Sequence, residues 1–276
     1  MPDTSPDTWD TTLAHAFDAA FGASARGAVE ARARLASWDG AGELTAHLHR
    51  ADQTFEILAL ALHRAGAATT PSAARQVFDK LLPQIAQDIR AVGLLAKLGF
   101  PYQAVTVSVS AFEHGVMLAS IGDDDERAER WLAHTDLTRN MDNVHDTVLR
   151  ALTNLDRDYP GLKAKLQVTH EGKLLGPYQT MYQRLCTFKH GNPVVQQHMQ
   201  ARATEALPLS IFAATERRAI IAAFWAIEAA IRAAWFALIS FIPHHLPLAP
   251  DWQPIMLGLN RAANELAAIR ARKELN

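Results

Sequence analysis

Residues 219–242 read AIIAAFWAIEAAIRAAWFALISFI and form the most apolar stretch of the chain. Two charged residues interrupt it, Glu228 and Arg232, which are four positions apart and would pair on one face of a helix. The uncharged run after Arg232 covers 10 residues, about half of the ~20 that a membrane span requires. We therefore expect a core or oligomer-interface helix here, and no membrane partner.

Helical spacing of apolar residues extends outward from this stretch over most of the chain. Of the 276 residues 50 are alanine, 49% are hydrophobic and 20% are charged, which excludes disordered, collagenous and disulfide-stapled classes. The segment TVSVS at 106–110 alternates like a strand but lies in a long helical run. We predict an all-α, up-and-down helical bundle without a strand pair, with helices near 10–37, 42–66, 72–98, 102–121, 124–158, 177–190, 215–241 and 252–273.

The predicted helices are organised as one helical domain over 1–276. Residues 1–70 would form an N-terminal helical extension, 71–242 the core bundle and 251–276 a C-terminal helix. Proline and glycine mark the boundaries: Pro71-Ser72 opens one helix, and Pro243 ends the apolar stretch.

Charge and cysteine content limit the function classes. The formal net charge is −2 and the pI is near 6.6, whereas nucleic-acid binders that rely on overall charge have pI values above about 9. Contact with RNA would therefore be local, and we expect no DNA partner. The first twenty residues lack a basic region followed by an apolar run, so we expect a cytoplasmic protein. Cys186 is the only cysteine and cannot form an internal disulfide.

Charge is also unevenly distributed. Residues 113–162 hold 11 acidic and 5 basic side chains, whereas 163–202 hold 6 basic and 1 acidic. The second segment is the best candidate to face phosphate. The alternative is that the two segments neutralise each other across a helix contact.

Common catalytic and cofactor motifs are absent. The chain has no G-x-S-x-G, no phosphate loop, no dinucleotide-binding glycine turn and no H-E-x-x-H. A di-iron bundle site needs Glu-x-x-His on two helices, and the nearest pattern is a single Asp142-x-x-His145. Neighbouring helical residues point about 100° apart, so Glu113 and His114 would not face one ion. We expect neither a cofactor nor a metal.

The chemistry with most support lies in Gly176–Pro193, where Arg184 and His190 enclose five residues near a helix end. A guanidinium can hold a scissile phosphate, and an imidazole can transfer protons near neutral pH. The spacing Arg-x(4–6)-His also occurs at Arg127/His134 and Arg139/His145. Three matches are about as many as chance gives for so short a pattern.

The sequence around the third match, Arg184/His190, is more specific than the motif alone. Arg-x(4–6)-His is the signature of the HEPN superfamily (higher eukaryotes and prokaryotes nucleotide-binding). The runs YQRLCTFKHGNP (182–193) and QAVTVSVSAFEHGVMLASIGDDDERAERWLAHTD (103–136) resemble an uncharacterised bacterial family of HEPN-like helical domains. In that family one helix carries R-x-x-x-E and a later helix ends in Y-x-x-L-S/C-x-x-x-H-G/P.

This resemblance implies a HEPN-like core over 71–242, a homo-oligomer with a site shared across a dimer, and metal-independent RNA cleavage or RNA binding in stress or phage defence. It implies catalytic roles for Arg184 and His190 and carries over Glu113, Tyr182 and Cys186. Two positions depart from the pattern: no arginine precedes Glu113 by a turn, and Leu185 stands where active nucleases favour a polar residue. We assign substrate binding to Tyr182, Lys189 and Asn192, and supporting roles to Glu113 and His114.

The alternative is a non-catalytic helical interaction or scaffold module. His190 would then stabilise a helix C-terminus, and Arg184 would pair with Glu113 or another acidic residue. Cys186 could form a thiolate–imidazole pair with His190, but a lone cysteine on an apolar helix is more often a small buried residue.

Overall fold

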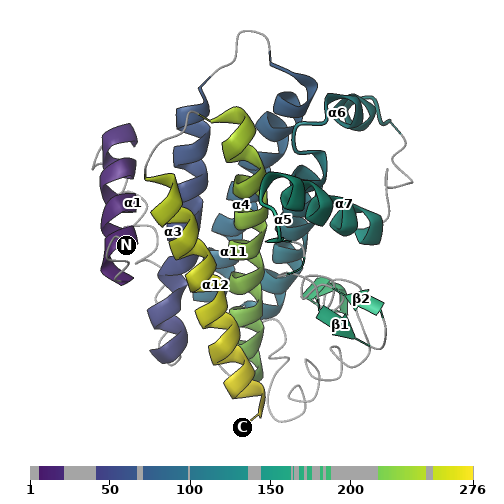
Figure 1. The fold of residues 1–276 in the computed structure, drawn as a ribbon. Coiled ribbons are helices and arrows are strands. Elements are labelled where there is room, and N and C mark those ends of the chain that lie inside the picture. The colour runs from purple at the N-terminus through teal and green to yellow at the C-terminus, as the bar shows by residue number, and fades with distance from the viewer. Residues whose placement is uncertain are drawn as a thin grey trace.

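The computed structural model is an all-α protein in which one long helix lies at the centre of a bundle (Figure 1). This confirms the predicted fold class. The described residues are 6–21, 42–66, 71–98, 100–135, 144–162, 164, 168–170, 173–175, 181–182, 185–187, 217–246 and 251–275.

The bundle is built around the apolar stretch that opens the sequence analysis. Its helix, α11, runs from Arg217 to His245 and packs mainly against α3 (Gly42–Ala65), α4 (Ala73–Lys97), α5 (Pro101–Ile121) and α12 (Trp252–Leu275). Helices α3, α4 and α5 run in alternating directions, as do α11 and α12, whereas α5 and α11 run in the same direction (Figure 1). Almost every residue of α11 from Ala222 to Ile242 is buried, which explains why its sequence is apolar on all sides.

Helices α5 and α11 approach each other closely at one glycine. A Cβ atom added to Gly115 would lie 2.5 Å from the carbonyl oxygen of Ala233 and 2.9 Å from its Cα. Such a distance is far inside van der Waals contact. The alanine-rich side of α11 and this glycine therefore set the spacing of the two helices.

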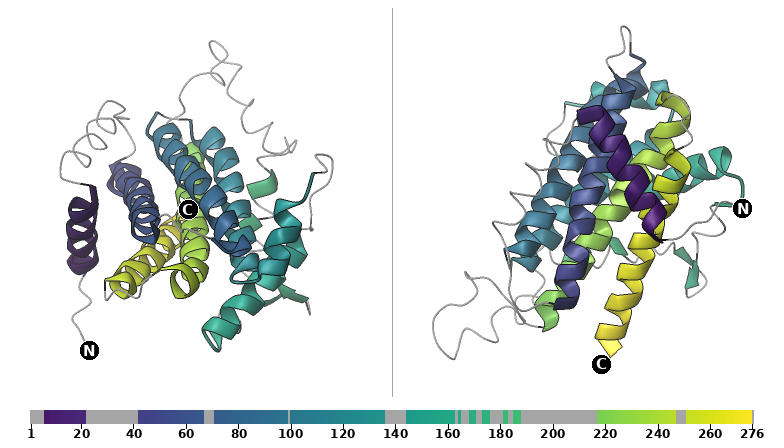
Figure 2. Two further views of the ribbon diagram at one scale, coloured as in Figure 1. Left: turned by 90° about the horizontal axis from the view of Figure 1, so that it is seen from above. Right: turned by 90° about the vertical axis from the view of Figure 1, so that its left-hand side faces the viewer.

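Helix α12 is joined to α11 by buried charges. Glu228 is 2% exposed and accepts hydrogen bonds from Arg232 and Arg270, both at 3.0 Å. The pairing of Glu228 with Arg232 on one helix face confirms that prediction. Arg270 also lies over the ring of Trp225, 3.4 Å from its centroid. Helix α1 (Pro6–Phe21) crosses α3 and α12 obliquely (Figure 2) and buries Leu13 there.

Two further helices cover one end and one side of the bundle. Helix α6 (Asp125–Leu132) contacts α4, and α7 (Val144–Asp158) packs on α5. Just after α7, the Tyr159 hydroxyl donates to the carbonyl of Ile239 at 3.2 Å. That carbonyl is four residues before Pro243, which has no N–H to donate to it. Helix α11 can therefore continue through Pro243 to His245.

Three expectations about secondary structure are wrong. The predicted helix 124–158 is interrupted, because α6 ends at Leu132 with Ala133 as C-cap. The predicted end at 241 is four residues early, for the reason given above. A short antiparallel hairpin is also present where no strand pair is expected: β1 (Val168–His170) pairs with β2 (Lys173–Leu175), with Thr169 opposite Leu174. Such three-residue strands are too short for alternation to reveal them.

Other boundaries agree with the sequence. Ser72 caps α4, accepting from the backbone N–H of Arg75 at 3.2 Å, and Asp251 precedes α12. The segment 106–110 is helical within α5. Of the predicted helix 10–37, residues 22–37 lie outside the described part.

Among the described helices, two are long and apolar enough to span a membrane on length and composition alone, Pro101–Ile121 and Ile221–His245. In this fold 67% and 89% of their most apolar windows are buried. The core helices of soluble proteins pass the same test. A cytoplasmic location and the lack of a membrane partner stay predictions.

Candidate functional site

The structure describes three of the seven predicted site residues: Glu113 and His114 on α5, and Tyr182 in a helical turn at 181–182. The other four lie outside the described residues: Arg184, Lys189, His190 and Asn192. Within the described residues the candidate site therefore consists of α5 and the elements that contact its outer face.

Glu113 and Tyr182 meet, although 69 residues separate them in the chain. The Tyr182 hydroxyl donates to Glu113 Oε1 at 2.7 Å. The Tyr182 ring lies nearly parallel to that of Phe112, with 6.3 Å between the centroids. Leu185, fully buried, anchors the following turn in the core. The segment that begins at 181 is thus held against the middle of α5 by one polar and several apolar contacts.

Cys186 is a second hydrogen-bond partner of Tyr182. It is partly buried and hydrogen-bonds to Tyr182 from one helical turn further along. Burial, followed by the neighbouring Cys186 and Glu113, raises the pKa of the Tyr182 phenol far above its ordinary value. Tyr182 therefore acts as a neutral hydrogen-bond donor over the whole physiological pH range.

His114 turns away from Glu113 and faces α4. Its Nδ1 lies 3.9 Å from Asp88 Oδ2, and both side chains are about 30% exposed or less. Ser110, one turn before His114 on α5, hydrogen-bonds to the same carboxylate. The prediction that Glu113 and His114 diverge is confirmed by these separate partners.

Asp88 is held in an environment that disfavours its charge. Burial raises the pKa of its carboxyl group, and the Ser110 hydrogen bond and the nearby imidazole oppose that rise without cancelling it. Ser110, Glu113 and His114, with Asp88 on one side and Tyr182 on the other, form a polar strip along the outer face of α5. We call these five residues the α5 strip.

The competing motif matches do not form an equivalent site in the described residues. Arg127 is 2% exposed, with its guanidinium directed to Ser120, while His134 lies on the surface beyond the end of α6. Arg139 and Asp142, and the side chain of His145, are outside the described part of the chain. Within the described residues no group of three His, Cys, Asp or Glu side chains is placed to hold a metal ion.

Sequence reasoning missed Asp88 and Ser110. Asp88 lies 26 residues before His114 on a different helix, so only the packing of α4 against α5 brings it to the site. The i, i+4 spacing of Ser110 and His114 was available as a signal that the two share a face. Nothing in the sequence links either residue to Asp88.

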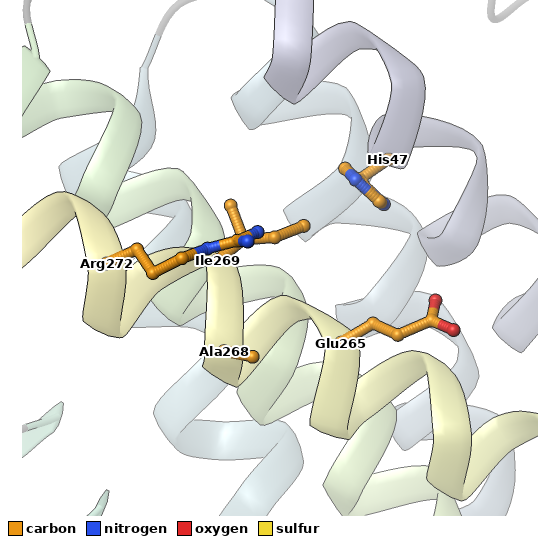
Figure 3. A pocket seen from close by; sticks show the side chains of 5 residues that line it. All are labelled: His47, Glu265, Ala268, Ile269 and Arg272. Carbon is orange, nitrogen blue, oxygen red and sulfur yellow. The ribbon is translucent and has the colours of Figure 1, made fainter.

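A shallow pocket of about 400 Å³ lies elsewhere, between α3 and α12. His47 of α3 lies on one side of it and Glu265, Ala268, Ile269 and Arg272 of α12 on the other (Figure 3). None of the predicted site residues lines it. The α5 strip and this pocket thus lie on different elements.

Comparison with known proteins does not identify the chain: no family model, no curated protein and no solved structure matches it.

Proposed function

We propose that this protein acts on RNA through a metal-independent site that includes Arg184 and His190, cleaving single-stranded RNA. The observation that carries the proposal is the hydrogen bond between Glu113 and Tyr182. These two residues come from the two separate runs of sequence that resemble HEPN-like domains. Because Glu113 and Tyr182 are in contact, the two runs lie together, which supports the proposal that they contribute to one site.

The contact also holds Tyr182, in the middle of the basic segment 163–202, against α5. Arg184 and His190 follow Tyr182 by two and eight residues. Both therefore lie within eight residues of a side chain that is held against α5. In the proposed reaction Arg184 holds the scissile phosphate, and His190 takes the proton from the ribose 2′-hydroxyl. Tyr182, Lys189 and Asn192 position the strand.

The decisive experiment is RNA cleavage in the presence of EDTA. The parent protein should cut a labelled single-stranded RNA, and Arg184→Ala and His190→Ala should each lower the rate by about 10²-fold or more. A single-stranded DNA of the same sequence should stay intact, because it has no 2′-hydroxyl. His134→Ala is the matched control: it removes an exposed histidine of a competing motif and should leave the rate unchanged.

The melting temperature distinguishes catalysis from a structural role. Both site variants should melt within about 2 °C of the parent, since a change of 1 kcal/mol moves the midpoint of a protein of this size by about 2–4 °C. A parent that neither cuts nor binds RNA would contradict the proposal, and variants that melt early would then favour the helical scaffold. Light scattering tests whether the protein is the dimer that the HEPN resemblance implies. If each site uses residues of both chains, mixing Arg184→Ala with His190→Ala should restore some activity.

A further inference from the structure

His245, the last residue of α11, packs between two aromatic rings of the core. Its ring centroid is 5.1 Å from that of Phe78 on α4 and 5.3 Å from that of Phe241 on its own helix. One ring nitrogen hydrogen-bonds to the backbone of Gly122, at the end of α5. The other, Nε2, is buried without a hydrogen-bond partner in the described part of the chain. A neutral imidazole fits this place, because an unpaired acceptor costs less than an unpaired charged donor.

Protonation of His245 would change that balance. It adds an N–H donor at Nε2, where the described residues offer no acceptor, and it adds a positive charge beside apolar rings. Arg75 of α4 already places a guanidinium 5.5 Å from the centroid of the Phe241 ring. That guanidinium is fixed by Asp79 at 2.8 Å and by the carbonyl of Gly66 at 2.7 Å. Asp79, the carboxylate of α4 that acts on His245, is thus already paired with another cation.

The titration of His245 follows from these surroundings. Burial, together with the charges of His244 and Arg75, lowers the pKa of its imidazole below the ordinary value of 6.5. The hydrogen bond to Gly122 and the carboxylate of Asp79 oppose this change without cancelling it. Because folding lowers this pKa, the stability of the closed arrangement is complete above pH 6.5 and is lost as the pH falls below that value.

His244, one position earlier, faces the end of α7 instead. Its Nε2 lies 3.0 Å from Asp158 Oδ2, and its Nδ1 lies 3.8 Å from Asp123 Oδ2. Arg157 joins the same two carboxylates, at 2.6 Å from Asp123 and 2.9 Å from Asp158. Burial alone would raise the pKa of Asp158, but hydrogen bonds from Arg157 and His244 hold it below its ordinary value. Asp158 therefore stays charged at mildly acidic pH, where a protonated His244 would bind it more strongly.

We propose that His244 and His245 form a pH-sensitive latch at the end of α11. On acidification, protonation releases His245 from between Phe78 and Phe241 and loosens residues 243–246, whereas the contact of His244 with α7 persists. Water then reaches two phenylalanine rings that are fully buried in the closed arrangement. The latch lies apart from the α5 strip and does not depend on the action proposed on RNA.

Hydrogen exchange followed by mass spectrometry tests the latch in the intact protein. Between about pH 7.5 and about pH 5, the amides of 241–246 should lose about tenfold of their protection, corrected for the intrinsic effect of pH on exchange. In His245→Gln, whose amide can still donate to Gly122 but cannot take up a proton, the loss should be less than about twofold. His244→Gln is the matched control: it removes a neighbouring imidazole and should retain most of the parent's loss.

An NMR titration of the histidine resonances measures the proton uptake itself. The His245 ring, assigned by its absence from the spectrum of His245→Gln, should titrate below pH 6.5. His245→Phe provides a second variant if the glutamine protein folds poorly, since a phenyl ring can pack between the two phenylalanines. A His245 ring that titrates at or above pH 6.5 would overturn the latch. Equal losses of protection in the parent and His245→Gln, or no loss in the parent, would do the same.

Discussion

A carboxylate is paired with a basic side chain both in the interior of the bundle and on the outer face of α5. The two pairs differ in how far they are buried. Glu228 is 2% exposed and closed off by two arginines at 3.0 Å. On the α5 strip, Asp88 and His114 are looser, at 3.9 Å, and partly open to water. Burial leaves no room for a substrate in the first case. Ionisable residues are therefore candidates for chemistry where the fold leaves them accessible to solvent and substrate.

The largest expected effect lies in the interior. Glu228→Ala leaves Arg232 and Arg270 without their shared carboxylate in a buried environment and should destabilise the protein by about 3–5 kcal/mol. Urea denaturation followed by circular dichroism measures the loss. Glu126→Ala, which removes an exposed i, i+4 pair with Arg130, should change stability by no more than about 0.5 kcal/mol. Similar losses for both variants would show that burial does not separate the two kinds of pair.

The second prediction addresses the inner face of α5. Gly115→Val inserts atoms where the backbone of Ala233 already lies within 3 Å of the Cβ position, and should cost about 2–3 kcal/mol through overpacking. Gly93→Ala is the control, because its new Cβ would meet side-chain atoms and no backbone: the Cβ of Ala51 at 3.0 Å and Oδ1 of Asp52 at 4.0 Å. Thermal unfolding should rank the two variants in that order. A Gly115→Val protein as stable as the parent would mean that α5 can move away from α11.

The third prediction concerns the outer face. Tyr182→Phe removes the donor to Glu113 and should cost about 1 kcal/mol, the usual net value of such a hydrogen bond. A double-mutant cycle with Glu113→Gln isolates the pairwise energy, which should be of the same size. Fully additive effects would indicate that the two side chains do not interact in solution.

The smallest expected effect follows from the raised pKa of Asp88. A carboxyl group whose pKa is raised by folding contributes stability at low pH and loses it as the pH rises above its ordinary value of 3.8. Asp88→Asn should therefore melt about 1 °C higher than the parent at pH 7, and the difference should vanish near pH 3. Melting curves between pH 3 and 8 measure this. An asparagine variant that is less stable at pH 7 would show that the carboxylate stabilises the fold.

The fold class was predictable because helical periodicity is a local property of the sequence. The apolar stretch 219–242 alone was enough to predict helix α11. The Glu228–Arg232 pair and the divergence of Glu113 from His114 follow from helix geometry alone. Asp88 and Arg270 could not be found in this way, since each reaches its partner through tertiary packing. At Pro243, likewise, the carbonyl of Ile239 that the proline cannot serve accepts from Tyr159, a residue 84 positions before the proline.

The close approach at Gly115 has a consequence for recognition. Glu113 and His114 lie on the same turn of α5 as Gly115, which contacts α11. Displacing the backbone of these two residues would therefore require α5 to move against α11. We expect the strip to behave as a rigid template. If the proposed action on RNA holds, a flexible single strand would adapt its own backbone to the template, whereas a stiff duplex could not.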